Sequence, residues 1–128
     1  RMTTLYQVAA TNKGIVVGTG NKVEDFGVGF YTKYGDGGVD ISPIADCNKT
    51  EVWELGKELG ILKEIIDAPP TDGLWDDGRT DEGQLGLSYK ELEEAMNNAN
   101  SQNREKYDSI RKVNLHKMKP IPVCKIPN

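Results

Sequence analysis

The stretch GIVVGTGNKVEDFGVGF (residues 14–30) decides the fold that the sequence predicts. Residues 15–17 are continuous and β-branched, which is typical of a short strand that is buried on both faces. A Gly-Thr-Gly turn follows, and Asn21 can cap a helix that carries Glu24 three residues later. The pattern therefore predicts a strand, a turn and a helix in direct succession.

A second stretch, TKYGDGGVDISPIADCNKTE (residues 32–51), continues this pattern. Residues 34–38 are rich in glycine and predict a loop, with Lys33 and Asp40 on either side. Residues 39–42 alternate like a strand, which Pro43 ends because proline cannot donate to a ladder. The β-α-loop-β-α order predicts an α/β fold, and two strands are too few for a sheet that stands alone.

The remainder of the chain predicts helices and one long loop. Periodic apolar residues and capping signals place helices at residues 2–10, 49–59, 62–66, 88–99 and 105–117. Gly60 is expected to form a C-terminal cap. Residues 67–87 are rich in Pro, Gly and Asp and predict a functional loop. We interpret its acids as solvated charges rather than a metal cluster: Asp72, Asp76, Asp77, Asp81 and Glu82.

Composition excludes several classes of function. The net charge of −4 offers no basic field for nucleic acid, and no apolar run approaches the ~20 residues of a membrane span. Cys47 and Cys124 lack a motif partner and are expected to be reduced thiols of a cytoplasmic protein. His116 is the only histidine, which excludes a multi-histidine metal site.

Polar residues near the two predicted strands are candidates for ligand binding, because ligands of open α/β sheets bind beyond the carboxyl ends of the strands. Thr19 could donate to a nucleotide, and Glu24 could bind Mg²⁺. Lys33 could meet a phosphate or carboxylate, and Asp40 could accept from a ribose hydroxyl or an amine. The alternative is that these residues only shape a turn, complete a cap or remain solvated.

Three later positions are also candidates. Lys49 lies in the first turn of a helix, where a cation opposes the helix dipole; a bound anion would explain it, and a flexible surface lysine is the alternative. Thr71 could reach a nucleotide or only shape a bend. His116 and Lys117 could bind a phosphate or an acyl group, or belong to an ordinary surface.

Five motifs together resemble the C-terminal half of the ammonia-dependent NAD⁺ synthetases, members of the N-type ATP pyrophosphatases. They are GTGNKVE (residues 18–24), FYTKYGDGGVDISPI (30–44), NKTEVWELGKELG (48–60), APPTDGLWDDGRTDEGQLG (68–86) and HK (116–117). The resemblance implies half of a Rossmann-like (adenine nucleotide alpha hydrolase-like) parallel-sheet domain with helices on both faces. Residues 1–128 are expected to be its C-terminal part. The family's SGGxDS pyrophosphate loop is absent and is expected upstream, since a helical pattern is already under way at Arg1.

The resemblance also implies a function. Such ligases convert deamido-NAD⁺ to NAD⁺ with ATP, ammonia and Mg²⁺ through an adenylate intermediate, and they are homodimers. By residue-wise resemblance, ATP contacts Thr19, Lys49 and Thr71; Mg²⁺ binds Glu24; deamido-NAD⁺ contacts Lys33, Asp40, His116 and Lys117. The resemblance assigns no catalytic residue. Without the pyrophosphate loop, the chain alone is expected to be inactive.

Two other functions remain open at this point. The chain could belong to another ATP pyrophosphatase, of the GMP synthetase type, although the KYGDGG loop (residues 33–38) disfavours this. It could also be a non-catalytic module for dimerisation or nucleotide binding.

Overall fold

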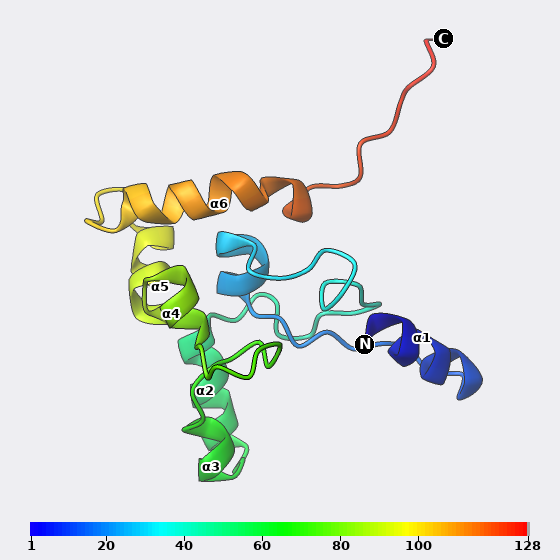
Figure 1. Ribbon diagram of the computed structural model, residues 1–128, viewed down its shortest axis with the longest axis horizontal. Coiled ribbons are helices and arrows are strands. Elements are labelled where there is room, and N and C mark those ends of the chain that lie inside the picture. Colours follow the sequence, from blue (N-terminus) through cyan, green and yellow to red (C-terminus); the bar gives the residue numbers. More distant parts are fainter. Residues whose placement is uncertain (128) are drawn as a thin grey trace.

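Helices dominate the structure, a computed structural model that describes residues 1–127 (Figure 1). In chain order these are α1 (Met2–Thr11), the π-helix η1 (Val23–Val28), α2 (Lys49–Glu58), α3 (Lys63–Ile66), α4 (Asp81–Leu85), α5 (Tyr89–Asn97) and α6 (Arg104–Met118). α6 crosses one end of the molecule, α2 and α3 form an arm at the other, and α1 projects to the side. No helix in the described part of the chain has both the length and the apolar character needed to cross a membrane.

The two predicted strands meet, but within residues 1–127 they form no regular sheet. One isolated parallel bridge joins Val17 to Ile41, and the Gly18 N–H donates to the Ile41 carbonyl at 2.7 Å. The expectation that residues 15–17 are buried on both faces is wrong, because Val16 is 7% exposed and Val17 52%. A parallel pair becomes a regular sheet only with further strands beside it, and the described residues supply no further strand.

Local capping signals correctly predicted several helix ends. At the start of α2 the Glu51 carboxylate accepts from the Asn48 N–H at 2.7 Å. At the start of α5, Ser88 and Glu91 form the expected capping box. Gly60, which follows the C-cap residue Leu59 of α2, has the left-handed φ of +69° expected at this position. These ends are fixed by residues that are neighbours in the sequence.

The prediction of one irregular loop over residues 67–87 is wrong for its last part, which contains α4. Thr80 caps this helix by accepting from the Gly83 N–H at 3.1 Å. The helix ends at Gly86, whose φ is +68°. Leu85 is buried, so α4 is held by the core as well as by its caps.

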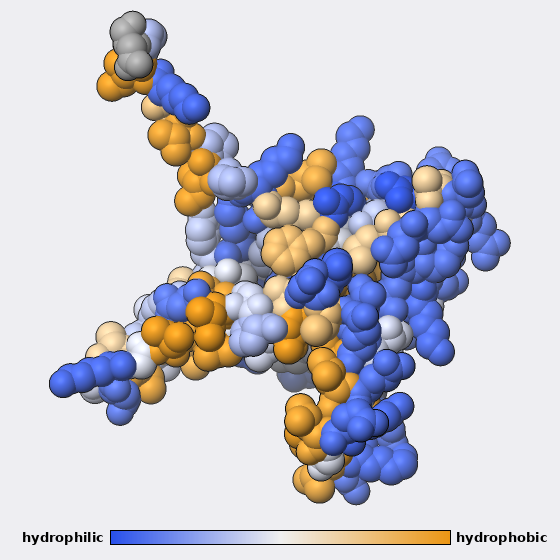
Figure 2. Space-filling view, turned by 180° about the vertical axis from the view of Figure 1, so that it is seen from behind, coloured by the Kyte–Doolittle hydropathy of each residue, from blue (hydrophilic) through white to orange (hydrophobic). Residues whose placement is uncertain are grey.

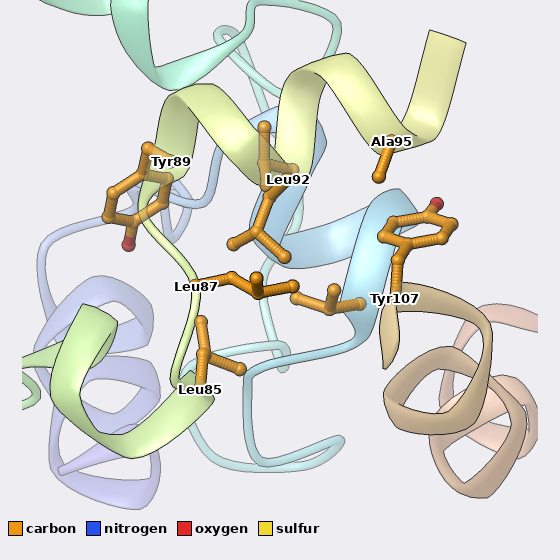
Figure 3. Close-up of a cluster of buried hydrophobic side chains, with 8 residues drawn as sticks. Leu85, Leu87, Tyr89, Leu92, Ala95 and Tyr107 are labelled. Atoms are coloured by element: carbon orange, nitrogen blue, oxygen red, sulfur yellow. The ribbon is translucent and has the colours of Figure 1, made fainter. Parts of the chain in front are cut away.

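The core lies where η1 meets the segment from α4 to α6. Figure 3 shows Leu92 of α5 near the middle of this cluster, with Tyr89 and Tyr107 toward opposite ends. The buried members are Val23, Val28, Leu85, Leu87, Tyr89, Leu92, Ala95 and Tyr107. Trp53 of α2 packs against the edge of the core, with its ring 6.0 Å from that of Tyr89 in an edge-to-face arrangement. The core thus fixes η1 and α2 relative to α5.

Apolar side chains are exposed on the arm formed by α2 and α3. Leu59 is 76% exposed, Leu62 67% and Ile65 63%. Figure 2 shows apolar surface on this arm and on the arm that contains α1, where Leu5 is 54% exposed. We call the set Leu59, Leu62 and Ile65 the apolar arm.

Candidate functional site

The GTGN turn leads into a helix of unusual type. Asn21 is buried, and its Oδ1 accepts from the N–H groups of Val23 at 3.0 Å and Glu24 at 3.2 Å. The predicted cap is therefore confirmed, but the helix that follows is a π-helix, a form that often occurs at functional sites. This cap fixes the backbone from which the Glu24 side chain extends.

The Glu24 carboxylate is held through one of its two oxygens. Its Oε1 accepts from the Tyr89 hydroxyl at 2.5 Å and lies 3.3 Å from the Lys49 ammonium. The side chains are 15% exposed for Glu24 and 20% for Lys49. Glu24 Oε2 accepts no hydrogen bond from residues 1–127 and is not among the buried unpaired atoms, so it remains open to a further ligand.

The structure explains why a cation, Lys49, is tolerated in the first turn of α2. The cation at the start of α2 pairs with the partly buried Glu24 and lies 5.0 Å from the centre of the Tyr89 ring. The carboxylate offsets the unfavourable helix dipole, and the face of the ring is attractive to a cation. The structure thus brings the predicted metal residue together with a predicted ATP residue.

Asp81 lies behind this group, and its interpretation as a solvated charge is wrong. It is 6% exposed, and its Oδ2 lies 3.1 Å from the Tyr89 hydroxyl. Its buried Oδ1 has no partner among the described residues. Burial raises the pKa of the Asp81 carboxyl. The Tyr89 hydroxyl thus lies within hydrogen-bonding distance of a carboxylate oxygen of Glu24 and of one of Asp81.

The sequence did not indicate Tyr89 because its partner Glu24 is distant in the chain, and Asp81 joins the group only through the Tyr89 hydroxyl. The phenol meets Glu24 across 65 residues. Burial, followed by the charge of Glu24, raises the pKa of Tyr89, so the phenol stays protonated and remains a donor. The capping signal of Thr80 before DEGQLG could have indicated that Asp81 begins a helix rather than a solvated loop.

The donor set at Glu24 fits Mg²⁺ held jointly with a phosphate. Mg²⁺ is usually bound through one or two carboxylates plus substrate phosphates, and Glu24 Oε2 provides one such oxygen. Within residues 1–127, no three His, Cys, Asp or Glu side chains converge as a self-contained metal cage. The residues therefore fit a metal that shares its ligands with a nucleotide, beside the Lys49 ammonium.

A cavity of about 610 Å³ lies between α1 and the glycine-rich segments. Its volume is within the range of about 300–1,000 Å³ for small-molecule sites. Apolar walls come from Leu5, Phe30 and Leu74, and polar groups from Thr19 and Lys117. Thr19 thus lines a space large enough for a ligand, whereas Glu24 and Lys49 are not among the residues that line it.

The glycine-rich loop is tied to the end of α6 by two lysines. Lys33 donates to the His116 carbonyl at 3.0 Å. Lys117 donates to the carbonyls of Gly29 at 2.9 Å and Tyr31 at 2.7 Å. The structure therefore gathers Lys33, His116 and Lys117, which are far apart in the sequence, beside the cavity.

A row of donors along α6 holds the C-terminal end of η1; we call it the α6 donor row. Tyr107 donates to the Gly27 carbonyl at 3.3 Å, and Asn114 to the Val28 carbonyl at 3.0 Å. Between them Arg111 donates to the carbonyls of Phe26 and Gly27. Carbonyls at a helix end lack partners within the helix, so this row and Lys117 satisfy them from outside. The spacing 107, 111, 114 and 117 was the available sequence signal.

Asp40 and Thr71 occupy different surroundings. The Asp40 carboxylate accepts from the Val16 N–H at 2.7 Å and the Tyr6 hydroxyl at 3.3 Å, so it links α1 to the bridged segment. Thr71 is exposed, one residue before Asp72, which lines the cavity. Within residues 1–127, no hydrogen bond joins Asp40 or Thr71 to Glu24 or Lys49.

A second, smaller cavity of about 130 Å³ is lined by Asp25, Tyr31 and Asp36, among others. Burial first, and then the charges of Glu24 and Asp36, raise the pKa of Asp25 to about 6. A Cβ at Gly20 would clash with the Asp25 carboxylate, so any larger residue there would displace the Asp25 side chain.

Sequence comparisons relate nearly the whole chain to one family. The family model described as NAD synthase matches residues 1–126. The NH(3)-dependent NAD(+) synthetase of Alkaliphilus oremlandii is 52% identical over 96 residues, which cover 75% of this chain and 38% of that protein. The corresponding protein of Syntrophomonas wolfei is 42% identical over 129 residues, covering 99% of this chain and 51% of its own length. The chain thus spans about half the length, or less, of these curated relatives.

Solved structures share the fold. The NMN synthetase from Francisella tularensis superposes with a TM-score of 0.90 at 35% identity, covering 98% of this chain and 53% of that protein. The NH3-dependent NAD synthetase from Campylobacter jejuni has a TM-score of 0.67 at 24% identity, with 98% and 52% covered, and supports the fold alone. With a family match over residues 1–126, the chain belongs to the NAD synthase family.

Proposed function

We propose that this chain supplies the Mg²⁺- and nucleotide-binding half of an ammonia-dependent NAD⁺ synthetase. The observation that carries the proposal is the pairing of Glu24 with Lys49. Thr19, in the turn that leads to Glu24, lines the large cavity together with Lys117. In this reaction the nicotinate carboxylate of deamido-NAD⁺ attacks the α-phosphate of ATP, and pyrophosphate leaves. Ammonia then attacks the acyl adenylate, and AMP leaves as the amide of NAD⁺ forms.

The ATP side of the site comprises Thr19, Glu24, Lys49 and Thr71. Glu24 would hold Mg²⁺ through Oε2, and the metal would offset negative charge on the phosphate oxygens. Lys49 presents a cation that is already positioned by the carboxylate and the Tyr89 ring. Cations fixed in advance stabilise charge that develops in the transition state without a cost of reorganisation.

The deamido-NAD⁺ side comprises Lys33, Asp40, His116 and Lys117. Hydrogen bonds to backbone carbonyls fix both lysine ammonium groups where the glycine-rich loop meets α6. Each ammonium has three donors, so donors remain for a phosphate or carboxylate of the substrate. Asp40 remains exposed although it accepts two hydrogen bonds, and it can accept another from a ribose hydroxyl.

The complete enzyme in this proposal contains a first half that carries the pyrophosphate loop. That half extends the bridged segments into a parallel sheet with helices on both faces, and residues 1–128 form the C-terminal part of the same domain. The exposed apolar arm and the length of the relatives support such a partner half. The enzyme is proposed to be a cytoplasmic homodimer.

A mononucleotide substrate is the second candidate. The superposition on an NMN synthetase, at a TM-score of 0.90, favours it. The chemistry is the same, because the nicotinate carboxylate is also present when the adenylate part of the dinucleotide is missing. The two candidates differ only in what fills the far end of the cavity.

The test is an assay of the full-length protein with ATP, Mg²⁺ and ammonia, and with one acceptor at a time. Deamido-NAD⁺ is expected to give the highest kcat/KM, nicotinic acid mononucleotide a lower value, and xanthosine monophosphate no product. A preference for the mononucleotide would select the second candidate, and amination of xanthosine monophosphate would select a GMP synthetase-type enzyme. Residues 1–128 alone are expected to form no NAD⁺; dimerisation without activity of the full-length protein would support a non-catalytic module.

A further inference from the structure

We infer that Tyr89 is a positioning residue for the metal-binding carboxylate: its hydroxyl holds Glu24 Oε1 so that Oε2 faces the metal. The inference rests on the proposed function, because it needs Mg²⁺ at Glu24. It gives a role to Tyr89 in α5, which lies outside the five motifs and is not one of the candidate ligand-binding residues.

The geometry separates the two oxygens of Glu24. The two partners of this carboxylate among residues 1–127, the Tyr89 hydroxyl at 2.5 Å and the Lys49 ammonium at 3.3 Å, both contact Oε1. The 2.5 Å contact lies at the short end for O–H···O bonds, as expected for a charged acceptor. A carboxylate anchored through one oxygen presents the other in a fixed direction.

The hydroxyl can position Glu24 because Tyr89 itself is immobilised. The side chain is 1% exposed in the core, and its N–H donates to Glu82 Oε1 at 2.8 Å. Trp53 packs edge-on against the ring at 6.0 Å. The capping box of Ser88 fixes the backbone directly before it. The ring is thus held by side chains from α2 and the core, and by the start of its own helix.

Asp81 completes the arrangement from the other side. Its Oδ2 lies 3.1 Å from the Tyr89 oxygen, so the phenol is held between two carboxyl groups. The shorter contact is the one to Glu24, and a phenol has one proton to donate. The shorter distance assigns this proton to Glu24, and Asp81 is the more distant acceptor.

Removal of this hydroxyl leaves the Lys49 ammonium as the one remaining partner of the Glu24 carboxylate among residues 1–127. The carboxylate is then free to rotate and pair with the ammonium through either oxygen, which costs metal affinity. Substitution of a group that orients a metal ligand typically weakens metal binding by roughly 10–100-fold. The ring and its packing remain in Tyr89→Phe, so the effect is confined to the hydroxyl.

The experiment measures Mn²⁺ binding, as a probe for Mg²⁺, to the full-length protein with a non-hydrolysable ATP analogue, by electron paramagnetic resonance. Tyr89→Phe is expected to weaken Mn²⁺ binding about 10–100-fold. The matched control is Tyr107→Phe, which removes a hydroxyl from the opposite part of the same core and is expected to leave Mn²⁺ affinity unchanged. Thermal unfolding of both variants reports any shared loss of stability.

The outcomes separate the inference from the proposed function. Equal Mn²⁺ affinity in wild type and Tyr89→Phe overturns the inference, provided that Glu24→Gln loses binding. Equal affinity in wild type and Glu24→Gln overturns both the metal site and the inference. Equal weakening by both tyrosine variants also overturns it, because the effect is then structural. NAD⁺ formation by the wild-type protein is scored separately and tests the proposed function.

Discussion

The position of Lys49 at the start of a helix is explained only by its partner, Glu24. A lysine in the first turn of a helix opposes the helix dipole, yet here Glu24 lies 3.3 Å away and both side chains are mostly buried. The sequence indicated that the position needed an anion. It could not identify Glu24 as that anion, because the pair spans 25 residues and depends on how η1 packs beside α2.

The ion pair predicts an effect on stability. Lys49→Met leaves the Glu24 carboxylate partly buried without its cation, and we expect a loss of about 1–3 kcal/mol, between the values for exposed and fully buried pairs. Urea unfolding measures it. The double variant Lys49→Met with Glu24→Gln is expected to recover part of the loss. If the two substitutions are strictly additive, the pair contributes nothing.

Asp25 predicts a dependence of stability on pH. Its pKa in the folded chain is about 6, above the usual value of 3.8, so the folded state holds this proton more tightly than the unfolded state. The contribution to stability is complete below pH 3.8 and is lost as pH rises through 6. The difference in unfolding free energy between wild type and Asp25→Asn is therefore expected to move in favour of the variant between pH 4 and pH 7. A constant difference across this range would contradict the raised pKa.

At the scale of elements, what could be predicted from the sequence was local. The ends of α2, α5 and the first turn of η1 follow from capping residues within four positions of one another. The α6 donor row joins residues about eighty positions apart, and no local pattern specifies its acceptors. The two predicted strands were only partly predictable. Their local sequences favour β structure, but a sheet needs neighbouring strands that the described residues do not provide.

The candidate site divides in the same way. The motifs indicated Glu24, Lys33 and Lys117 by residue type, whereas Tyr89 and Asp81 became visible only once the helices were placed.

The α6 donor row predicts a local change in dynamics. Arg111→Ala removes the donor to the carbonyls of Phe26 and Gly27, and Lys112→Ala, one residue along on the exposed side of α6, is the matched control. We expect faster amide hydrogen exchange over residues 26–38 in the first variant and not in the second. Faster exchange over the whole chain would instead indicate a general loss of stability.

At the scale of the whole molecule, the distribution of apolar surface is uneven. The core is confined to η1 and the segment from α4 to α6, while the apolar arm is exposed. An exposed apolar patch of this kind marks a contact surface. The chain spans about half of the Syntrophomonas wolfei relative, so the proposed first half of the domain is the natural partner for this surface.

This proposal makes a prediction for the full-length protein. Leu62→Ser is expected to destabilise it by about 1–2 kcal/mol, although Leu62 is 67% exposed within residues 1–127, because the first half covers it. Val113→Ser on α6 is the control; Val113 is 71% exposed, and its substitution is expected to change stability by less than about 0.5 kcal/mol. Denaturant unfolding compares the two. Equal, small effects would show that the apolar arm stays exposed.

The contacts between α6 and the glycine-rich segment also bear on the order of events during synthesis. Lys117 meets Gly29 across 88 residues. A ribosome releases the N-terminal part of a chain first, so the carbonyls of residues 26–31 leave it long before α6 is made. Until then those carbonyls bond to water, and the loop beside the cavity has no support from this side. Residues 26–31, although made early, are therefore among the last to acquire their final hydrogen bonds.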